Sequence, residues 1–394
     1  MNTKHCALIL AFGLLFSACG GGAGPDTRPI PTQFLDRALP QSTATEVGLP
    51  ADSWNRVLRE IDDKQMPVDQ ISILIKGKQV AALHRNGFSE TTMHDLRSAT
   101  KSITALLVGI AVDKGLIKDL DTPVDGYFPE WPSHPSRANY PPLTLRHLLT
   151  MRSGLDCDDW TDTPGNEERM YRSANWVRFF QDIPARRAPG SAYSSCTAGV
   201  VVLGEIVAGA SGQRLPEFAQ AQLFDPLGIR NVRWADAGAS ITDAGGHLRL
   251  TLNSMLKIGE LVRRGGEWEG NQVVSAQWLG HMLRPTTAAP FPPESGLKAQ
   301  YGMLWWLEPV RDGVARSYQA RGNGGQYIIN VPEVELVVAV TGHAYNQGKA
   351  QLAAFLLVDQ ILIPALRHDL TALSSPPTLS RLCDEKHARP SCPE

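Results

Sequence analysis

The amino-acid sequence predicts an α+β fold, in which one antiparallel β-sheet is flanked by helices and an all-helical subdomain is inserted into the chain. Three observations predict it. A strand pair near residue 77 precedes a long apolar helix that follows residue 98. The stretch of about 120–245 holds helical segments and Pro/Gly-rich loops with few strand-like runs. Strand-like runs return after residue 300, and an apolar helix over 350–366 follows them.

The N-terminus has the features of an export signal. Residues 1–18 carry Lys4, then an apolar run and small residues, which predicts a secretory signal peptide too short to span a membrane. The signal ends in F-S-A-C-G, which resembles a bacterial lipoprotein signal with Cys19 as the lipidated residue. Residues 19–48 would be a flexible Gly/Pro-rich tether. We therefore expect a periplasmic protein, lipid-anchored to the outer membrane; a secreted form without an anchor is the alternative.

Residues 49–84 predict a helix followed by a β-hairpin. The apolar residues of 49–66 fall on one helical face: Trp54, Val57, Leu58 and Ile61. The run I-S-I-L-I-K-G-K-Q-V-A-A-L-H then predicts two strands joined at Lys76 and Gly77.

A second helix is predicted to follow Ser98 and to end near Gly115. Its apolar residues recur at helical spacing: Ile103, Leu106, Leu107, Ile110 and Ala111. After the insert, L-N-S-M-L-K-I-G-E-L-V predicts a helix, whereas Y-G-M-L-W-W, Q-Y-I-I-N-V-P and E-L-V-V-A-V-T-G predict strands. The folded domain would span 49–366, and 367–394 would be a C-terminal tail.

The cysteines predict disulfides in an oxidising compartment. Cys6 leaves with the signal and Cys19 takes the lipid, which leaves four: Cys157, Cys196, Cys383 and Cys392. Because Cys383 and Cys392 bracket a short polar loop, we expect the pairs Cys383–Cys392 and Cys157–Cys196. The alternative is that Cys157 and Cys196 are separate buried thiols.

Composition excludes several classes of protein. With 394 residues and 43% hydrophobic residues the chain can bury a large core, and a net charge of −2 gives no indication of nucleic-acid binding. No G-x-S-x-G or H-E-x-x-H motif occurs, so neither an α/β-hydrolase elbow nor a hydrolytic zinc site is expected. We expect no cofactor and no metal, a monomer, and membrane contact only through the lipid anchor. His147 is expected to be structural, and Asp156, Asp158 and Asp159 to form a solvated acidic loop.

A serine three residues before a lysine occurs three times: Ser98/Lys101, Ser254/Lys257 and Ser295/Lys298. The second pair is predicted to lie in mid-helix with its lysine on a solvated face, and the third in a Pro-rich loop. Only Ser98 sits where irregular chain turns into a buried helix, so that Lys101 stands over its hydroxyl. Free N–H groups at the helix start suit an oxyanion, and a neutral, desolvated lysine can take the serine proton. The alternative is an N-cap serine with a surface lysine.

Several stretches resemble one family, in the family's order. They are R-S-A-T-K-S-I-T-A, L-T-L-R-H-L-L-T-M-R-S-G-L-D, P-G-S-A-Y-S-S-C-T-A-G, Y-G-M-L-W-W and G-N-G-G-Q-Y-I-I-N-V-P. They are similar to motifs of the serine β-lactamase-like hydrolase superfamily, in particular its class C β-lactamase, esterase and 6-aminohexanoate-dimer hydrolase branch. The likeness runs from about residue 50 to 366. It implies a β-lactamase/DD-peptidase-like fold in which Ser98 is the nucleophile and Lys101 the base.

The second motif departs from the family pattern. When the family motif is aligned without gaps with residues 189–204, its proton-transferring tyrosine corresponds to Ser195. Tyr193 then stands where the family usually has a packing phenylalanine. In an extended segment both side chains share a face, so either could approach Ser98. We favour Ser195 as the proton shuttle. Tyr193 is the alternative shuttle, or else a core residue.

The third motif departs as well. Where the family has Lys-Thr-Gly or His-x-Gly, this chain has Asn323, Gly324 and Gly325, which the resemblance places beside the substrate. By position the N–H groups of Ser98 and Gln326 would form the oxyanion hole. The missing lysine removes a cation that would hold a β-lactam carboxylate, which favours neutral esters or amides.

The resemblance therefore implies a serine hydrolase of carboxylesterase or amidase type, acting on a small-molecule or peptide ester or amide. The substrate would bind between the helical subdomain and the sheet. One alternative is a β-lactamase or D-alanyl-D-alanine peptidase acting on cell-wall peptides. The other is a non-catalytic binding or sensor lipoprotein with the same fold.

Overall fold

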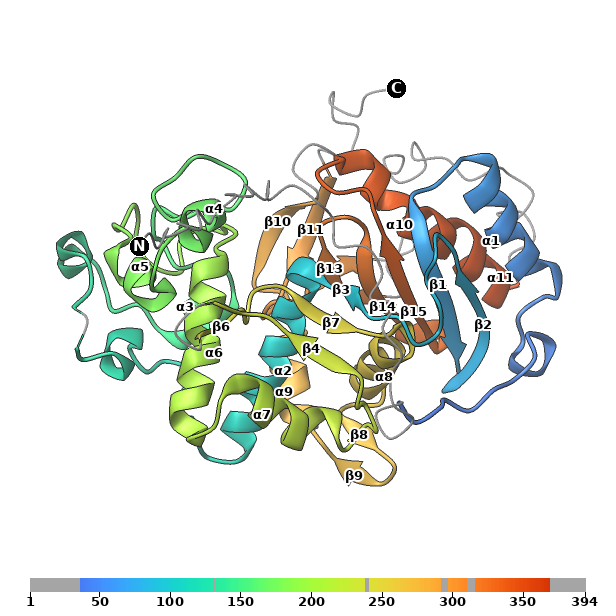
Figure 1. Ribbon diagram of the computed structural model, residues 1–394, viewed down its shortest axis with the longest axis horizontal. Coiled ribbons are helices and arrows are strands. Elements are labelled where there is room, and N and C mark those ends of the chain that lie inside the picture. The colour runs from blue at the N-terminus through green and yellow to red at the C-terminus, as the bar shows by residue number, and fades with distance from the viewer. Residues whose placement is uncertain (1–35, 131, 238–240, 292–296, 310–315, 369–394) are drawn as a thin grey trace, which may run out of the picture.

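The main feature of the computed structural model is an eight-stranded antiparallel sheet beside a helical region (Figure 1). The structure describes residues 36–130, 132–237, 241–291, 297–309 and 316–368. The order of strands across the sheet is β10 (Thr287–Phe291), β11 (Leu297–Tyr301), β12 (Trp306–Pro309), β13 (Arg316–Gly322), β14 (Gln326–Val331), β15 (Leu336–Gly342), β1 (Val68–Ile75) and β2 (Lys78–His84). The predicted antiparallel sheet is confirmed.

The predicted hairpin is β1–β2, and its two linking residues have positive φ angles, 52° at Lys76 and 76° at Gly77. A two-residue link of this kind matches the twist of the strands that it joins. The runs predicted as the strands β14 and β15 are confirmed. The stretch Y-G-M-L-W-W differs from its prediction, because residues 302–305 are the connection between β11 and β12 and only its two ends are in strands.

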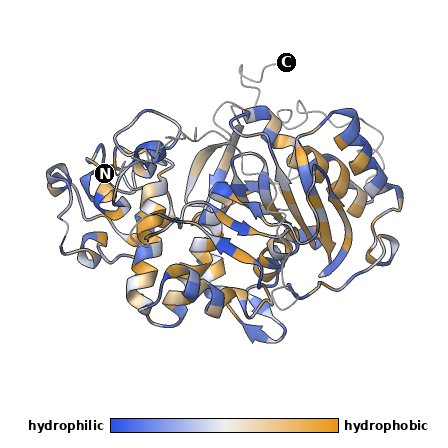
Figure 2. Ribbon diagram, viewed as in Figure 1, coloured by the Kyte–Doolittle hydropathy of each residue, from blue (hydrophilic) through white to orange (hydrophobic). Residues whose placement is uncertain are grey.

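Helices cover both faces of the sheet. On one face lie α1 (Asp52–Asp63) and the continuous helical segment Gly348–Leu366, which contains α10 (Ala353–Leu357) and α11 (Ile363–Leu366). That segment is long and apolar enough to cross a membrane, but 78% of it is buried in the protein, as in a core helix. On the other face lie α2 (Thr100–Asp113), α8 (Leu252–Arg263) and α9 (Ala276–Met282). Figure 2 shows the central strands as predominantly hydrophobic, as a sheet buried on both faces requires.

The helix α2 is buried on every side, because it is enclosed between the sheet, α9 and α6 (Thr197–Ser211). All residues from Thr100 to Ala111 are buried, so the predicted one-sided apolar stripe was too narrow a description. Lys101, in the first turn of α2, is therefore only 5% exposed.

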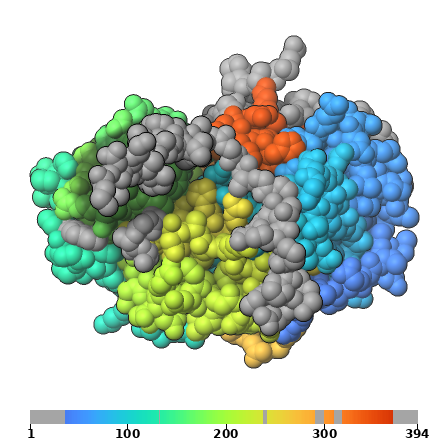
Figure 3. All heavy atoms as spheres, viewed as in Figure 1, coloured from blue at the N-terminus to red at the C-terminus, as the bar shows by residue number. Residues whose placement is uncertain are grey.

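The predicted helical insert is present. Its helices are α3 (Leu145–Leu149), α4 (Glu167–Tyr171), α5 (Trp176–Asp182), α6 and α7 (Leu215–Ala219). The sequence did not indicate a second, three-stranded sheet, in which β7 (Leu248–Leu250) pairs with β3 (His94–Asp95) on one side and with β4 (Val232–Trp234) on the other. Figure 3 shows the insert, in green, at one end of the molecule and the N-terminal part, in blue, at the other.

One of the two expected disulfides is formed. Cys157 and Cys196 are bonded to each other and join the loop after α3 to the start of α6. Cys19, Cys383 and Cys392 lie outside the described residues, so lipidation and the second disulfide stay predictions.

Candidate active site

Ser98 and Lys101 are brought together as the sequence predicts. Ser98 lies in a 3₁₀ turn (Arg97–Ala99) that runs into α2. The Lys101 Nζ donates a hydrogen bond to Ser98 Oγ at 2.9 Å and another to the Gly245 carbonyl at 2.9 Å. The amine is thus held by two oxygen atoms, in a buried position, with the serine hydroxyl directly in front of it.

The two other Ser-x-x-Lys pairs do not form such a site. Ser254 is the third residue of α8 and not in mid-helix, and Lys257 is 1% exposed, so its predicted place on a solvated face was wrong. Lys257 Nζ donates to the Gly228 carbonyl at 3.0 Å, and burial lowers the pKa of Lys257 to about 8. The third pair cannot be compared, because Ser295 lies outside the described residues.

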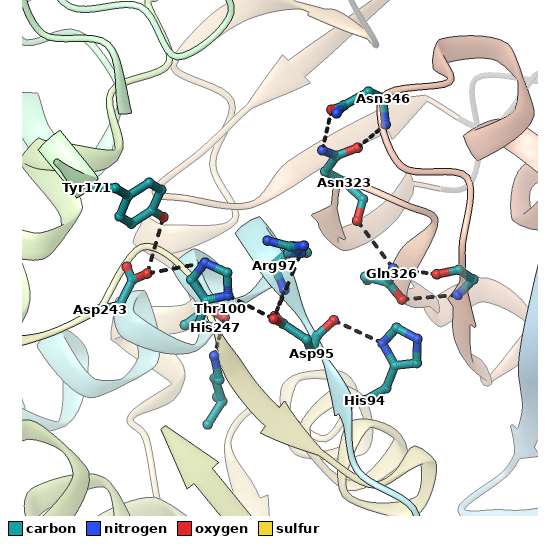
Figure 4. A network of polar contacts seen from close by, with 12 residues as sticks. His94, Asp95, Arg97, Thr100, Tyr171, Asp243, His247, Asn323, Gln326 and Asn346 are labelled. Carbon is teal, nitrogen blue, oxygen red and sulfur yellow. Dashed lines mark hydrogen bonds and ion pairs between the residues drawn. The ribbon is translucent and has the colours of Figure 1, made fainter. Parts of the chain in front are cut away.

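The turn before the nucleophile is held by a polar network (Figure 4). Arg97 has a positive φ of 50°, and its N–H donates to Asp95 Oδ1 at 2.9 Å. The other oxygen of Asp95 lies 2.8 Å from His247 Nδ1, and this hydrogen bond raises the pKa of His247. His247 Nε2 lies 3.9 Å from Asp243, whose carboxylate accepts a hydrogen bond from the Tyr171 hydroxyl at 3.2 Å. An uncommon backbone conformation is thereby maintained next to Ser98.

Ser98 and Lys101 line a pocket of about 270 Å³ between the insert and the sheet strands β11 to β14. Aromatic rings form much of its wall. The Tyr193 ring packs edge-on against Tyr301 with centroids 5.2 Å apart, and Tyr301 packs against Trp306 in the same way at 5.1 Å. Trp160, which is 56% exposed, stands at the wall on the insert side. The pocket therefore offers an apolar surface directly beside a polar nucleophile.

Both candidates for the proton shuttle line this pocket. The Ser195 hydroxyl donates to Asp159 Oδ2 at 2.7 Å. Burial raises the pKa of Tyr193 well above its usual value, so its hydroxyl is a weaker acid than that of an exposed tyrosine. The expectation of a solvated acidic loop was wrong for Asp159, because its carboxylate also accepts hydrogen bonds from the Thr197 main chain and side chain.

The predicted third motif lies mostly outside the pocket. Asn323 lines it, but Gly324, Gly325 and Gln326 are not among its lining residues. The two glycines, with φ angles of 98° and 96°, form the turn from β13 to β14. Gln326 is fully buried in β14, and its side-chain amide donates to the main-chain carbonyls of Gly342 and Asn323.

Gly322, which the sequence analysis did not select, is the strand residue that contacts the nucleophile turn. A Cβ atom added to Gly322 would lie 2.1 Å from the Leu96 carbonyl oxygen and 3.1 Å from the Ala99 nitrogen. Only glycine lets the end of β13 pass so close to the backbone on either side of Ser98. The signal in the sequence was the glycine that precedes Asn323, one residue before the motif that was chosen.

Arg321 is a second residue that the sequence analysis missed. It lines the pocket, stacks over Trp306 at 4.6 Å and Phe355 at 4.8 Å, and forms an ion pair with Glu308 at 2.9 Å. The third-motif lysine is absent as the sequence shows, but Arg321 brings a different cation to the pocket, where Glu308 balances its charge. Within the described ranges no group of three His, Cys, Asp or Glu side chains is placed to hold a metal ion.

Comparisons with known proteins match most of the chain. The beta-lactamase family model matches residues 54–360. The 6-aminohexanoate-dimer hydrolase of Paenarthrobacter ureafaciens is 25% identical over 301 residues, which cover 70% of this chain and 74% of that protein. Esterase EstB of Burkholderia gladioli is 32% identical over 158 residues, 38% of this chain and 40% of the esterase. A putative 6-aminohexanoate-dimer hydrolase structure from Bacillus anthracis superposes with a TM-score of 0.64 at 18% identity, over 80% of this chain and 82% of that one, which shows a shared fold.

Proposed function

The chain belongs to the beta-lactamase family, and from this premise we propose that it cleaves ester or amide bonds through an acyl-enzyme on Ser98. The observation that carries the proposal is the 2.9 Å contact between Lys101 Nζ and Ser98 Oγ in a buried pocket. Relatives named as an esterase and as a 6-aminohexanoate-dimer hydrolase support the choice of ester and amide bonds. A carboxylesterase or amidase with Lys101 as base is the specific form of the proposal.

In the first half of the reaction, Lys101 takes the proton of Ser98, and the serine oxygen attacks the substrate carbonyl carbon. The carbonyl oxygen becomes an oxyanion and is stabilised by main-chain N–H groups. When the tetrahedral intermediate collapses, the leaving group departs with a proton and the acyl group stays on Ser98. Water then attacks the acyl-enzyme, and Lys101 returns its proton to the Ser98 oxygen.

We propose that the oxyanion hole consists of the N–H groups of Ser98 and Asn323, in place of the expected pair with Gln326. Gly322 pairs with Gln326 in the β-ladder, and the Gly325 N–H donates to the Gly322 carbonyl to close the turn. N–H groups of successive residues in a strand point in opposite directions. Since the main-chain groups of Gly322 face β14, the N–H group of the next residue, Asn323, faces away from β14. Asn323 lines the pocket, which supports this assignment.

Ser195 is the preferred donor of the leaving-group proton. Its hydroxyl already takes part in a hydrogen bond to a carboxylate, whereas the Tyr193 ring is packed between Tyr301 and Trp306 and its pKa is raised by burial.

The pocket supports an apolar acyl or alcohol group of small to moderate size. Arg321 favours a second candidate, cleavage of a β-lactam or a D-alanyl-D-alanine peptide, because its guanidinium could attract a substrate carboxylate. The ion pair with Glu308 reduces that attraction, so the neutral substrate is preferred.

The test is hydrolysis of a p-nitrophenyl ester and of a chromogenic cephalosporin, side by side, by residues 20–394 and by the Ser98→Ala variant. Ester turnover that requires Ser98, with an inert cephalosporin, is expected. Cephalosporin turnover would favour the second candidate. If neither compound reacts and Ser98→Ala is indistinguishable from the parent, the proposal fails and a binding protein is the better interpretation.

Export and lipidation are proposed separately, on the sequence features of residues 1–19 alone. Labelling of the full chain with radioactive palmitate in a bacterial host should require Cys19. Equal labelling of a Cys19→Ser variant would contradict the anchor.

A further inference from the structure

Behind Ser195 lies a chain of three side chains that the proposed reaction has not used. The Ser195 hydroxyl and the Thr197 hydroxyl both contact Asp159 Oδ2, at 2.7 and 3.0 Å. On its other side the Thr197 Oγ1 lies 2.9 Å from Glu167 Oε2. A continuous path of hydrogen bonds therefore runs from the pocket wall to Glu167 in α4.

The number of protons in this chain is fixed by its geometry. A threonine hydroxyl carries one proton and can donate one hydrogen bond, while its lone pairs accept others. Thr197 Oγ1 contacts two carboxyl oxygens, and two ionised carboxylates can only accept. One of the two carboxyl groups must therefore be protonated and donate to Thr197.

Glu167 is the protonated member. Asp159 accepts hydrogen bonds from the Ser195 hydroxyl and from the main-chain N–H and the hydroxyl of Thr197, so its oxygens act as acceptors. Burial, followed by the negative charge of Asp159, raises the pKa of Glu167 to about 7. The charges that act on Glu167 from other segments are Lys101, which lowers its pKa, and Asp243, which raises it.

We propose that Glu167 stores the proton that the leaving group receives, and that Thr197 and Asp159 relay it to Ser195. This inference rests on the proposed function. Glu167 and Thr197 do not touch the substrate; they are positioning residues that act through Ser195.

The proton transfers balance over one cycle. During acylation the Ser98 proton passes to Lys101. The Ser195 hydroxyl, which donates to Asp159 in the structure, turns toward the leaving atom and gives it the proton as the bond to the acyl carbon breaks. Ser195 regains a proton from Thr197 through Asp159 Oδ2, and Glu167 re-protonates Thr197, which leaves a carboxylate at Glu167 and an ammonium at Lys101. During deacylation the attacking water gives a proton back along the same path to Glu167, while Lys101 re-protonates Ser98.

The disulfide holds the relay together. Cys196 lies between Ser195 and Thr197 in the sequence, and Cys157 lies two residues before Asp159. The Cys157–Cys196 bond holds their Cα atoms 5.5 Å apart and so keeps the two segments side by side. The Asp159 N–H also donates to the Ser195 carbonyl at 3.0 Å. A serine hydroxyl that is not re-protonated by a relay is a poor acid. The relay therefore accounts for a serine at the position of the family's tyrosine.

The test compares two esters of the same acid, a p-nitrophenyl ester and an ethyl ester, by kcat/KM, which reports the steps up to departure of the alcohol. Nitrophenolate can leave as the anion, whereas ethoxide needs a proton. In Glu167→Gln and Thr197→Val, kcat/KM for the ethyl ester should fall by about 100-fold or more, while that for the p-nitrophenyl ester changes little. Thr197→Ser, which keeps the hydroxyl, is the matched control and should behave as the parent.

The pH profile gives a second readout, which a purely structural role would not move. In the parent, kcat/KM for the ethyl ester should fall as pH rises through about 7, the pKa of Glu167. This fall should be absent in Glu167→Gln. Equal effects on both esters, or an unchanged pH profile, would overturn the relay while Ser98-dependent p-nitrophenyl turnover keeps the proposed function. A parent inert toward both esters would overturn both proposals. Should Thr197→Val not fold, the isosteric Glu167→Gln decides alone.

Discussion

The close passage of β13 past the nucleophile turn can be tested with one methyl group. In Gly322→Ala the new Cβ would lie 2.1 Å from the Leu96 carbonyl oxygen, and real Cβ contacts are essentially never below 3.0 Å. Since the obstructing atom is main chain, no side-chain rotation relieves the clash, and the strand end and the turn must separate by about 1 Å. A displacement of that size between Ser98 and the oxyanion hole should lower kcat/KM for a p-nitrophenyl ester by about 100-fold. Overpacking should also cost about 1–3 kcal/mol of unfolding free energy.

The matched control is Gly209→Ala in α6, where an added Cβ meets nothing within 4 Å. It should leave kcat/KM unchanged and raise the unfolding free energy by about 0.5–1 kcal/mol, because alanine is the better helix former. Steady-state kinetics and urea unfolding of both variants provide the comparison. If Gly322→Ala retains the kinetics and stability of the parent, the end of β13 is not packed against the Ser98 turn, and the proposed oxyanion hole has to be abandoned.

Three further predictions concern stability, each measured by urea unfolding. The fall in the pKa of Lys257 from 10.5 to about 8 means that the parent loses about 2 kcal/mol of unfolding free energy as pH drops from about 10 to about 8, and Lys257→Met should lack this loss. Equal slopes of stability against pH in the two proteins would contradict the lowered pKa. Replacing Cys157 and Cys196 by serine opens a cross-link between residues 39 apart and should cost about 4 kcal/mol, whereas a cost near zero would argue against the disulfide. The raised pKa of His247 stabilises the fold below about pH 6.5 and less as pH rises through the raised value, so His247→Gln should cost more at about pH 5.5 than at about pH 9. The opposite order would exclude an ion pair with Asp95.

Local signals in the sequence were sufficient for the parts of the site that are close in sequence. Ser98 and Lys101 lie one helical turn apart, so helix geometry alone brings their side chains together. The turn at Lys76 and Gly77 was similarly predictable, because a two-residue link between apolar runs is a short-range signal. The pairing of Cys157 with Cys196 followed from eliminating the tail cysteines.

Residues that act through distant contacts were not predictable in the same way. Asp159 looked like part of a solvated loop because nothing nearby in sequence binds it, whereas its partners come 36 and 38 residues later. Lys257 looked like a surface residue because helical periodicity does not reveal that a loop at Gly228 covers that face. Gly322 was missed because the motif was aligned on the glycine pair of the following turn, and only the paired strands show which glycine meets the nucleophile.

The strands β10, at one edge of the sheet, and β13, between β12 and β14, also escaped the sequence analysis. Their sequences, T-A-A-P-F and R-S-Y-Q-A-R-G, lack a continuous apolar run. Such strands are recognised by the hydrogen bonds of a neighbouring strand and not by their own composition. The same limitation hid Arg321, which lies within β13.

The most direct test of the central claim is to identify the residue that carries the acyl group. The protein is mixed with p-nitrophenyl acetate, quenched in acid within the first turnover, digested and analysed by mass spectrometry. An acetyl group on Ser98 of the parent, absent from Ser98→Ala and formed far more slowly in Lys101→Met, is the predicted result. Acetylation of a different residue, or ester turnover retained by Ser98→Ala, would contradict a nucleophile at Ser98 activated by Lys101.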